Sequence, residues 1–370
     1  MPIQLGRQKC LQMLNTFIVG KGSGLCIGEL GKLTNLRGSL SIFELQNIES
    51  STNVLNVTSL RDKKYLEELV LRWKYASLYL ESCKYCSSLP PLGQLPSLQN
   101  LSIVGFDEVV RVGHDFCGSG SSSVKPFGAL KVLWLMEMPK WEEWVSFGDE
   151  NGGGAFPQLE KLYIRNCTKL TGGLPVHLSS LSKLDFIKCP QLVTPLPLTP
   201  TIRELEFSDC NEMLLKELPI GMEKIVIKGF NALESLPKGM IDSNDSLQEL
   251  KIYKCSSLMS LPKDGPPSSI KILYISECKK LELSTHLDHS SLEKLCLWNC
   301  GSLKCFPLDL SPKLYNIKIK GCSNLESLTV PENYEHDLVT LQIDLSYCPN
   351  FVSFPKEGLR APALYCFFFF

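Results

Sequence analysis

The feature that most constrains the fold is a short pattern that recurs along most of the chain. Its clearest copy is the stretch 291–307, SLEKLCLWNCGSLKCFP, where Leu295 and Leu297 alternate as in a strand with one buried face. Cys300 follows Leu295 by five residues, and two further apolar residues follow at intervals of three. That spacing fits no amphipathic helix, and a unit this short cannot bury its own apolar side. The stretch therefore predicts copies of itself on both flanks.

The copies can be aligned on the first inward residue of each strand, here called the index residue. Five positions after it comes a cysteine in most units: Leu78 and Cys83, Leu162 and Cys167, Leu184 and Cys189, Leu205 and Cys210, Leu250 and Cys255, Leu273 and Cys278, Leu295 and Cys300, Ile317 and Cys322. Phe106, Met138 and Phe230 take that place after Leu101, Leu133 and Ile225. Successive index residues from Leu162 to Leu341 are 20 to 25 residues apart. That period is typical of leucine-rich repeats.

The repeat predicts an α/β-type leucine-rich-repeat solenoid, a horseshoe with a parallel sheet on its concave face. Proline after the outer apolar residue of many units, as in Phe306-Pro307, favours an extended convex side with few short helices. We expect one solenoid over residues 1–370. Its parts are N-terminal repeats at 1–73, a suspected deletion junction at 74–77, repeats with Gly/Ser-rich and acidic loop insertions at 78–155, regular repeats at 156–359, and a truncated tail at 360–370.

Two places depart from the regular spacing. Strands predicted at 69–71 and 78–80 are separated by six residues, whereas neighbouring parallel strands need a return path of about a dozen residues or more. This favours a segment lost near Lys74, by deletion, splicing or mis-assembly of the gene model. In the last repeat, Cys348 follows Leu341 by seven residues instead of five, which predicts a bulge around Asp344 and Leu345.

The cysteines, the histidines and the glycine-rich segment argue against a metal site, a cofactor site or catalysis. Nine of the sixteen cysteines fall on the ladder, where a small buried hydrophobe is needed, so we expect reduced structural thiols. Cys83-x-x-Cys86 and His286-x-x-His289 lack the paired spacing of a zinc site, and GKGSG at 20–24 lacks the Walker order. No metal, cofactor or catalytic group is therefore expected, and the chain is not predicted to be an enzyme.

Charge and hydropathy limit the partners. The formal charge of −1 provides no general attraction to nucleic acid or to an anionic membrane. The chain contains no apolar run near 18 residues, and its start lacks the apolar region of a secretory signal. These features predict a cytoplasmic protein without a membrane span.

Several phrases resemble one family. LTNLRGSLSIFELQNI (33–48), KKYLEELVLRW (63–73), PPLGQLPSLQNLSI (90–103), LMEMPKWEEW (135–144) and CPNFVSFPKEGL (348–359) are similar to the leucine-rich-repeat region of plant intracellular nucleotide-binding disease-resistance proteins of the coiled-coil class. The resemblance implies a role in innate immunity. It gives no ground for ATP or ADP binding, because no nucleotide-binding segment precedes residue 1.

The strand pattern also selects candidate binding residues. If the index residue and the second residue after it point inward, the first and third residues after it point onto the concave sheet. Large aromatic or basic side chains at these positions are Trp134, Tyr163, Arg165, Lys228, Lys251, Tyr253, Tyr274, Trp298, Lys318 and Lys320. Such residues anchor protein interfaces, although aromatic residues also favour strands for packing alone. Trp141 and Trp144 either pack under the convex loops or contact a partner.

Two functions fit these observations. The first is a recognition module whose concave face binds a pathogen effector, a guarded host protein or the nucleotide-binding domain of a resistance protein. The second is a truncated, non-functional or decoy fragment of a resistance protein, which we expect to aggregate because a solenoid without polar caps exposes its core at both ends.

Overall fold

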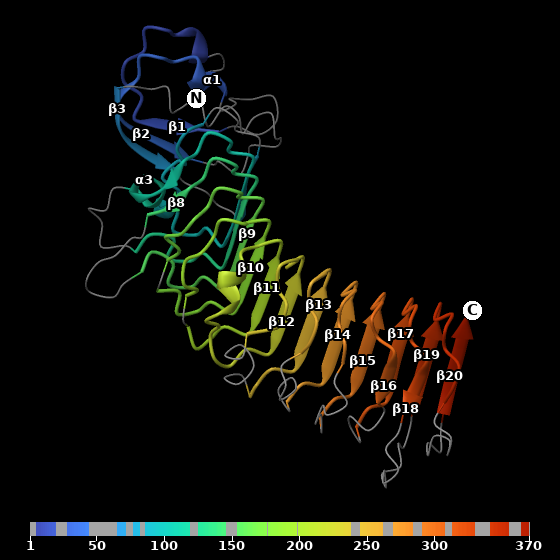
Figure 1. The fold of residues 1–370 in the computed structure, drawn as a ribbon. Helices are drawn as coiled ribbons and strands as arrows, with labels where there is room; N and C mark the ends of the chain where they lie inside the picture. Colours follow the sequence, from blue (N-terminus) through green and yellow to red (C-terminus); the bar gives the residue numbers. More distant parts are fainter. Residues whose placement is uncertain are drawn as a thin grey trace. The chain divides into compact units, whose positions relative to one another are not determined.

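The computed structural model describes residues 5–19, 28–43, 65–71, 77–81, 86–118, 125–145, 154–175, 177–197, 199–237, 245–261, 269–283, 291–307, 313–329, 341–354 and 364–369. The chain divides into two compact units, Met1–Thr201 and Ile202–Phe370. In each unit, successive turns of the chain place parallel strands side by side (Figure 1).

The first unit contains two parallel sheets. One has the order β1 (Thr16–Ile18), β2 (Arg37–Phe43), β3 (Tyr65–Leu71). The other has the order β4 (Ser77–Glu81), β5 (Asn100–Val104), β7 (Val132–Met136), β9 (Lys161–Arg165), β10 (Lys183–Ile187). β3 and β4 therefore belong to different sheets, so the short connection between them does not join neighbouring strands. Residues 74–76 of the suspected junction lie outside the described part of the chain.

The second unit contributes strands to one parallel sheet. Their order is β11 (Glu204–Ser208), β12 (Lys224–Lys228), β13 (Glu249–Tyr253), β14 (Ile272–Ser276), β15 (Lys294–Trp298), β17 (Asn316–Lys320), β19 (Leu341–Ser346), β20 (Leu364–Phe369). Neighbouring strands align index residue to index residue, as with Leu250, Leu273 and Leu295. β20 lies in the tail that the sequence pattern predicts to be a truncated repeat, and it pairs along its whole length with β19. The predicted leucine-rich-repeat fold with a parallel sheet is confirmed.

The return side of the repeats carries only short elements among the described residues. β6 (Arg111–Val112) pairs with β8 (Glu143–Trp144), and β16 (Cys305–Pro307) pairs with β18 (Ser327–Thr329). The helices are η1 (Leu5–Arg7), α1 (Gly28–Gly31), η4 (Leu92–Gln94), α3 (His114–Cys117) and η5 (Glu212–Leu215). The longest has four residues, which agrees with the extended return side that the proline positions predicted.

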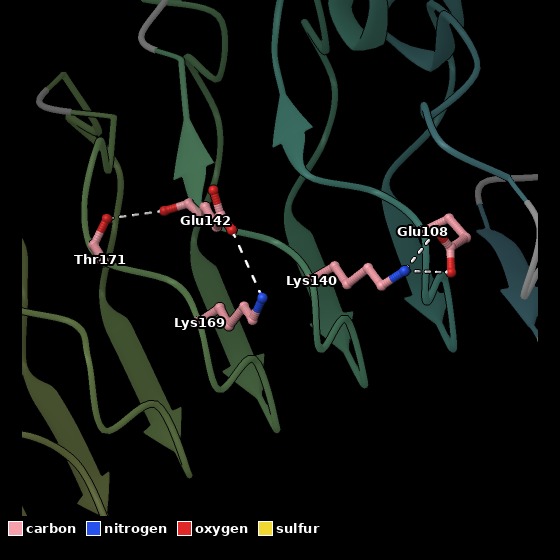
Figure 2. A network of polar contacts seen from close by, with 5 residues as sticks. All are labelled: Glu108, Lys140, Glu142, Lys169 and Thr171. Carbon is pink, nitrogen blue, oxygen red and sulfur yellow. Dashed lines mark hydrogen bonds and ion pairs between the residues drawn. The ribbon is translucent and has the colours of Figure 1, made fainter.

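A second ladder of contacts joins the return segments of the first unit. The backbone N–H groups of Thr171 and Val193 donate to the carbonyl oxygens of Glu142 and Thr171, at 3.0 and 3.1 Å. Figure 2 shows side chains that add to it: Lys140 Nζ lies 2.7 Å from each carboxylate oxygen of Glu108, and Thr171 Oγ1 donates to the Glu142 carbonyl. Because these side chains are exposed, the ion pair contributes little to stability, and the backbone bonds fix the repeat spacing.

The cysteine ladder forms part of the core. Cys167, Cys189, Cys255, Cys278, Cys300 and Cys322 are buried, whereas Cys210 and Cys348 are half-buried. Cys83 lies outside the described residues. Burial raises the pKa of Cys167 to about 12. Its thiol is therefore neutral at physiological pH and acts as a small apolar group, as the repeat pattern predicts.

The register of the last repeats corrects one prediction. Ile343, not Leu341, pairs with Ile317, and the alignment of β19 with β17 runs through Leu345 and Ser346 without a shift. Cys348 then follows its true index residue by the usual five positions. The expected bulge around Asp344 and Leu345 is therefore wrong, because the two additional residues precede the inward part of the strand.

The residue four positions after the index residue adopts a left-handed backbone in repeat after repeat. It is non-glycine at Glu137, Asn166, Lys188, Asp209, Lys254, Glu277, Asn299 and Tyr347, with φ between 53° and 57°. Gly105, Gly229 and Gly321 take the same place with φ between 65° and 75°. This conformation turns the chain out of the strand, and the N–H of Glu277, for example, donates to the Trp298 carbonyl of the next strand at 2.8 Å. The lateral bond accompanies a conformation that costs a non-glycine residue about 1–2 kcal/mol.

Trp141 and Trp144 lie fully buried on the return side of the first unit, so packing is their structural role. Trp141 Nε1 donates to the Glu143 carbonyl at 2.9 Å, whereas Trp144 Nε1 is buried without a hydrogen-bond partner among the described residues. We therefore expect Trp141→Phe to lower the free energy of unfolding by about 1 kcal/mol more than Trp144→Phe, because only Trp141 loses a hydrogen bond. Urea denaturation of both variants tests this, and an equal or larger loss for Trp144→Phe would contradict it.

Candidate functional site

The ten predicted binding residues occupy the sheet face that points away from the core, in two separate groups. Trp134, Tyr163 and Arg165 lie on β7 and β9 of the first unit. The other seven lie on β12 to β17 of the second unit and are called here the aromatic–lysine patch: Lys228, Lys251, Tyr253, Tyr274, Trp298, Lys318 and Lys320. The two groups differ in how many of their charged side chains form ion pairs within the chain and in how much of their aromatic surface is exposed.

In the group of the first unit, the side chains mainly contact one another and the neighbouring Asp185. The rings of Trp134 and Tyr163 are stacked, with centroids 3.5 Å apart and planes within 3° of parallel. The guanidinium of Arg165 lies 5.4 Å from the Trp134 ring centroid and 5.6 Å from that of Tyr163. The same guanidinium donates to both carboxylate oxygens of Asp185, at 3.0 and 2.5 Å.

These residues lie on the outer face as expected, but neighbouring side chains cover two of them. Tyr163 is only 8% exposed, and Asp185, another residue expected to face outward, is fully buried. A buried carboxylate requires a compensating charge, which Arg165 supplies here. Tyr163 and Arg165 therefore have an evident structural role, and much of their binding capacity is used within the chain.

The patch in the second unit is laid out in two rows by the strand register. The row at the third position after the index residues contains Lys228, Tyr253, Ser276, Trp298 and Lys320. The row at the first position contains Lys251, Tyr274, Cys296 and Lys318. The first of these rows begins and ends with a lysine, whereas the second starts with Val226 on β12 before Lys251 and ends with Lys318. The aromatic residues lie between the lysines.

The three aromatic residues form a continuous cluster. The ring centroids of Tyr253 and Tyr274 are 4.9 Å apart, and those of Tyr274 and Trp298 are 5.2 Å apart in an edge-to-face arrangement. Trp298 remains 37% exposed, which is unusual for the largest apolar side chain. Burial, with a smaller contribution from the neighbouring Tyr253, raises the pKa of Tyr274 to about 12. The Tyr274 hydroxyl is therefore neutral at physiological pH and retains its proton for hydrogen bonding.

The basic residues of the patch are only partly neutralised. Lys251 Nζ lies 2.6 Å from Glu249, and Lys320 Nζ lies 3.3 Å from Asp344. Lys228 and Lys318 make no ion pair with any carboxylate of the described residues. Burial tends to raise the pKa of Glu249, but hydrogen bonds from Lys251 and Lys224 outweigh it, so the pKa of Glu249 is lowered. The patch consequently carries a local positive charge on a chain whose formal charge is −1.

Several residues of this face were not predicted. Glu249 and Lys224 precede their index residues and reach the same face, as the period-2 alternation would have indicated had it been extended one residue backward. Tyr79, 63% exposed on β4, also lies one position after its index residue, Leu78. The partnership of Arg165 with Asp185 had no signal in the sequence beyond their alignment on neighbouring strands.

The possible metal or phosphate motifs fall largely outside the described residues: Cys83 of the CxxC pair, His286, His289 and the GKGSG segment at 20–24. Within the described ranges, no group of three His, Cys, Asp or Glu side chains is arranged to hold a metal ion. No helix within those ranges has the length and apolar character needed to cross a membrane.

Comparison with known proteins now adds to this geometry. Residues 27–77 match a family model described as R13L1/DRL21 leucine-rich repeats. A candidate disease resistance protein of Arabidopsis thaliana, At3g14460, is 24% identical over 96% of this chain and 40% of its own length. RPP13-like protein 1, a candidate disease resistance protein of the same plant, is 27% identical over 74% of this chain and 30% of its own. The candidate disease resistance protein RGA1 of Solanum bulbocastanum is 29% identical over 70% and 28%.

The repeats and the parallel sheet give the chain a leucine-rich-repeat fold. Its homologues over most of its length are named as plant disease resistance proteins of the RPP13-like and RGA types, so the resemblance seen in the sequence is confirmed. The chain spans 28% to 40% of the length of these relatives. The alignment with At3g14460 runs over 579 residues, so that relative contains stretches with no counterpart in the 370 residues here.

Proposed function

We propose that the chain is a non-catalytic recognition module of plant innate immunity and that the aromatic–lysine patch is where it binds a protein. The partner is a pathogen effector, a guarded host protein or the nucleotide-binding domain of a resistance protein, in the cytoplasm. The observation that carries the proposal is the half-exposed Trp298 in edge-to-face contact with Tyr274, in a patch where Lys228 and Lys318 have no carboxylate partner among the described residues.

The contrast between the two units supports the choice of the patch. In the first unit, Arg165 is committed to Asp185 and Tyr163 is buried, so little of that group is left for a partner. In the patch, exposed aromatic area and unpaired charge coincide, and this combination is what anchors protein interfaces. The homologues' names supply the immune context.

The second candidate is a truncated, non-functional or decoy fragment of a resistance protein. It is favoured by the stretches of At3g14460 that lie within the 579-residue alignment and have no counterpart in this chain. The two candidates predict different behaviour, because a recognition module has a selective surface and a non-functional fragment has none.

A photo-crosslinking residue introduced at Trp298 tests the proposal in leaf tissue that expresses the chain. We expect it to join the chain to a discrete partner protein, whereas the same residue at Val352 should not, because Val352 is 83% exposed but lies after the strand, away from the patch. Prior replacement of Tyr253 and Tyr274 by alanine should abolish the product. Identical products from both positions, or none from Trp298 in a folded chain, would refute the proposal.

A further inference from the structure

We propose that the aromatic–lysine patch binds an extended acidic segment of its partner, with an apolar side chain lying on the aromatic cluster and carboxylates on either side. This inference rests on the proposed function and specifies the chemistry of the partner. It follows from the order of residues along the two rows, the charges left unpaired and the distance that the rows span.

The lysines stand at both ends of the aromatic cluster. Lys228 on β12 and Lys251 on β13 lie on one side, and Lys318 and Lys320 on β17 lie on the other. Tyr253 lies on β13 with Lys251, and Tyr274 and Trp298 lie on the intervening strands β14 and β15. From β12 to β17, the patch therefore presents basic side chains first, then aromatic side chains, then basic side chains again.

The charge of the patch is available to a ligand. Lys228 is exposed, and neither it nor Lys318 is paired with a carboxylate of the described residues. Burial raises the pKa of Cys296, and the charges of Lys318, Lys251, Lys294 and Lys320 around it act against that shift. Four ammonium groups therefore act on one point of the face, which favours an anionic ligand there.

The span of the rows gives the length of the ligand. Adjacent strands are about 4.8 Å apart, so the four intervals from β12 to β17 cover about 19 Å. An extended peptide advances about 3.3 Å per residue and therefore crosses that distance in about six residues. The complementary segment carries acidic residues about six positions apart and an aromatic or large aliphatic residue midway.

A nucleic acid would use the same residue types, with phosphates on lysines and bases on the aromatic rings. The carboxylates beside the patch favour a peptide. Glu249 and Asp344 lie next to two of the four lysines and would repel a continuous line of phosphates, whereas discrete carboxylates can be placed at Lys228 and Lys318. The patch also contains no arginine, the residue that best binds phosphate in two-pronged fashion.

The test uses the full chain and a fluorescent 12-residue peptide with Glu pairs about six residues apart around a central Trp. Fluorescence anisotropy gives its dissociation constant at two salt concentrations. The comparison probes are the same peptide with Lys in place of Glu, the peptide with Ala in place of Trp, and an oligo-uridine strand of similar length. The variants are Lys228→Glu with Lys318→Glu, and Trp298→Ala. The matched control is Lys279→Glu with Lys280→Glu, which changes the charge equally at exposed positions outside the patch.

We expect the acidic peptide to bind and the lysine peptide not to bind. Reversal of Lys228 and Lys318 should weaken binding about tenfold and reduce its salt dependence, whereas the control pair should change it less than about twofold. Trp298→Ala should weaken binding about 30-fold and leave the salt dependence intact. Circular dichroism and thermal melting of each variant confirm that the fold is retained.

The inference is overturned if the acidic peptide fails to bind, if the Lys279 and Lys280 control weakens binding as much as the patch variant, or if oligo-uridine binds more tightly than the peptide. Failure here is distinguishable from failure of the proposed function. If the crosslink from Trp298 persists in the Lys228 and Lys318 variant, protein recognition at this face still holds and only the acidic ligand is rejected. If no specific crosslink forms from Trp298, both proposals are rejected.

Discussion

Replacing Arg165 with methionine is expected to lower the free energy of unfolding of the first unit by on the order of 3 kcal/mol. The reason is the carboxylate of Asp185, which has a side chain only 1% exposed and two hydrogen bonds from the Arg165 guanidinium. Methionine has a similar length and retains packing on the rings of Trp134 and Tyr163, but it leaves a buried charge without compensation. Urea denaturation followed by tryptophan fluorescence measures the loss, because Trp134, Trp141 and Trp144 all lie in this unit.

Two further variants separate charge from packing. In Arg165→Met with Asp185→Leu, both charges are gone, and most of the stability should return, because an apolar pair replaces a buried ion pair at little cost. Lys131→Met is the control: Lys131 lies 3.1 Å from Glu160, but both side chains are 45% exposed, so its loss should change stability by less than about 1 kcal/mol. Equal effects of Arg165→Met and Lys131→Met would show that the Asp185 carboxylate needs no partner.

Replacing Gly173 with alanine is expected to cost about 3 kcal/mol of the stability of the same unit. Gly173 has φ of +81°, and an added Cβ would overlap the carbonyl oxygen of Trp144 and lie 2.9 Å from its carbonyl carbon. Both groups belong to the backbone, so no side chain can rotate to make room. The β8 segment that contains Trp144 would have to move, and with it the buried indole.

Gly221→Ala is the matched control for that substitution. Gly221 has nearly the same φ, +82°, but the nearest atom to its Cβ would be Arg203 Nη1 at 3.7 Å. Only the backbone strain remains, so Gly221→Ala should cost about 1 kcal/mol. Denaturation of the two variants, each compared with the unchanged chain, gives the difference. If Gly173→Ala proved no worse than Gly221→Ala, close packing against Trp144 would not be the reason for glycine at position 173.

The aromatic–lysine patch was predictable residue by residue, yet its availability was not. The period-2 alternation placed Tyr253, Tyr274 and Trp298 on the outer face of the sheet, and the structure keeps them together there. The same alternation placed Tyr163 and Arg165 on the outer face of the first unit. Whether a residue is free for a partner depends on its neighbours across strands, and the sequence of one strand contains no information on the next.

The repeat pattern by itself determined the fold class, the strands and the register of nearly every unit. Leucine, isoleucine and cysteine recur at fixed offsets because each unit must bury them against the next. The spacing of these residues along the chain therefore predicts how the units stack. Where the spacing between repeats varied, the pattern predicted the wrong index residue. The leucine pattern predicts Leu341 as an index residue, but the observed pairing with Ile317 selects Ile343.

Tertiary structure alone decided three features. The left-handed residue that ends a strand can be lysine, glutamate or asparagine, because a lateral backbone bond accompanies that conformation at Lys254, Glu277 and Asn299 alike. β3 and β4 lie in different sheets, which pairing rather than composition determines. Arg165 is committed to Asp185, whereas Lys228 and Lys318 are not paired within the described residues, because charges on neighbouring strands either meet or miss one another only once the repeats are stacked.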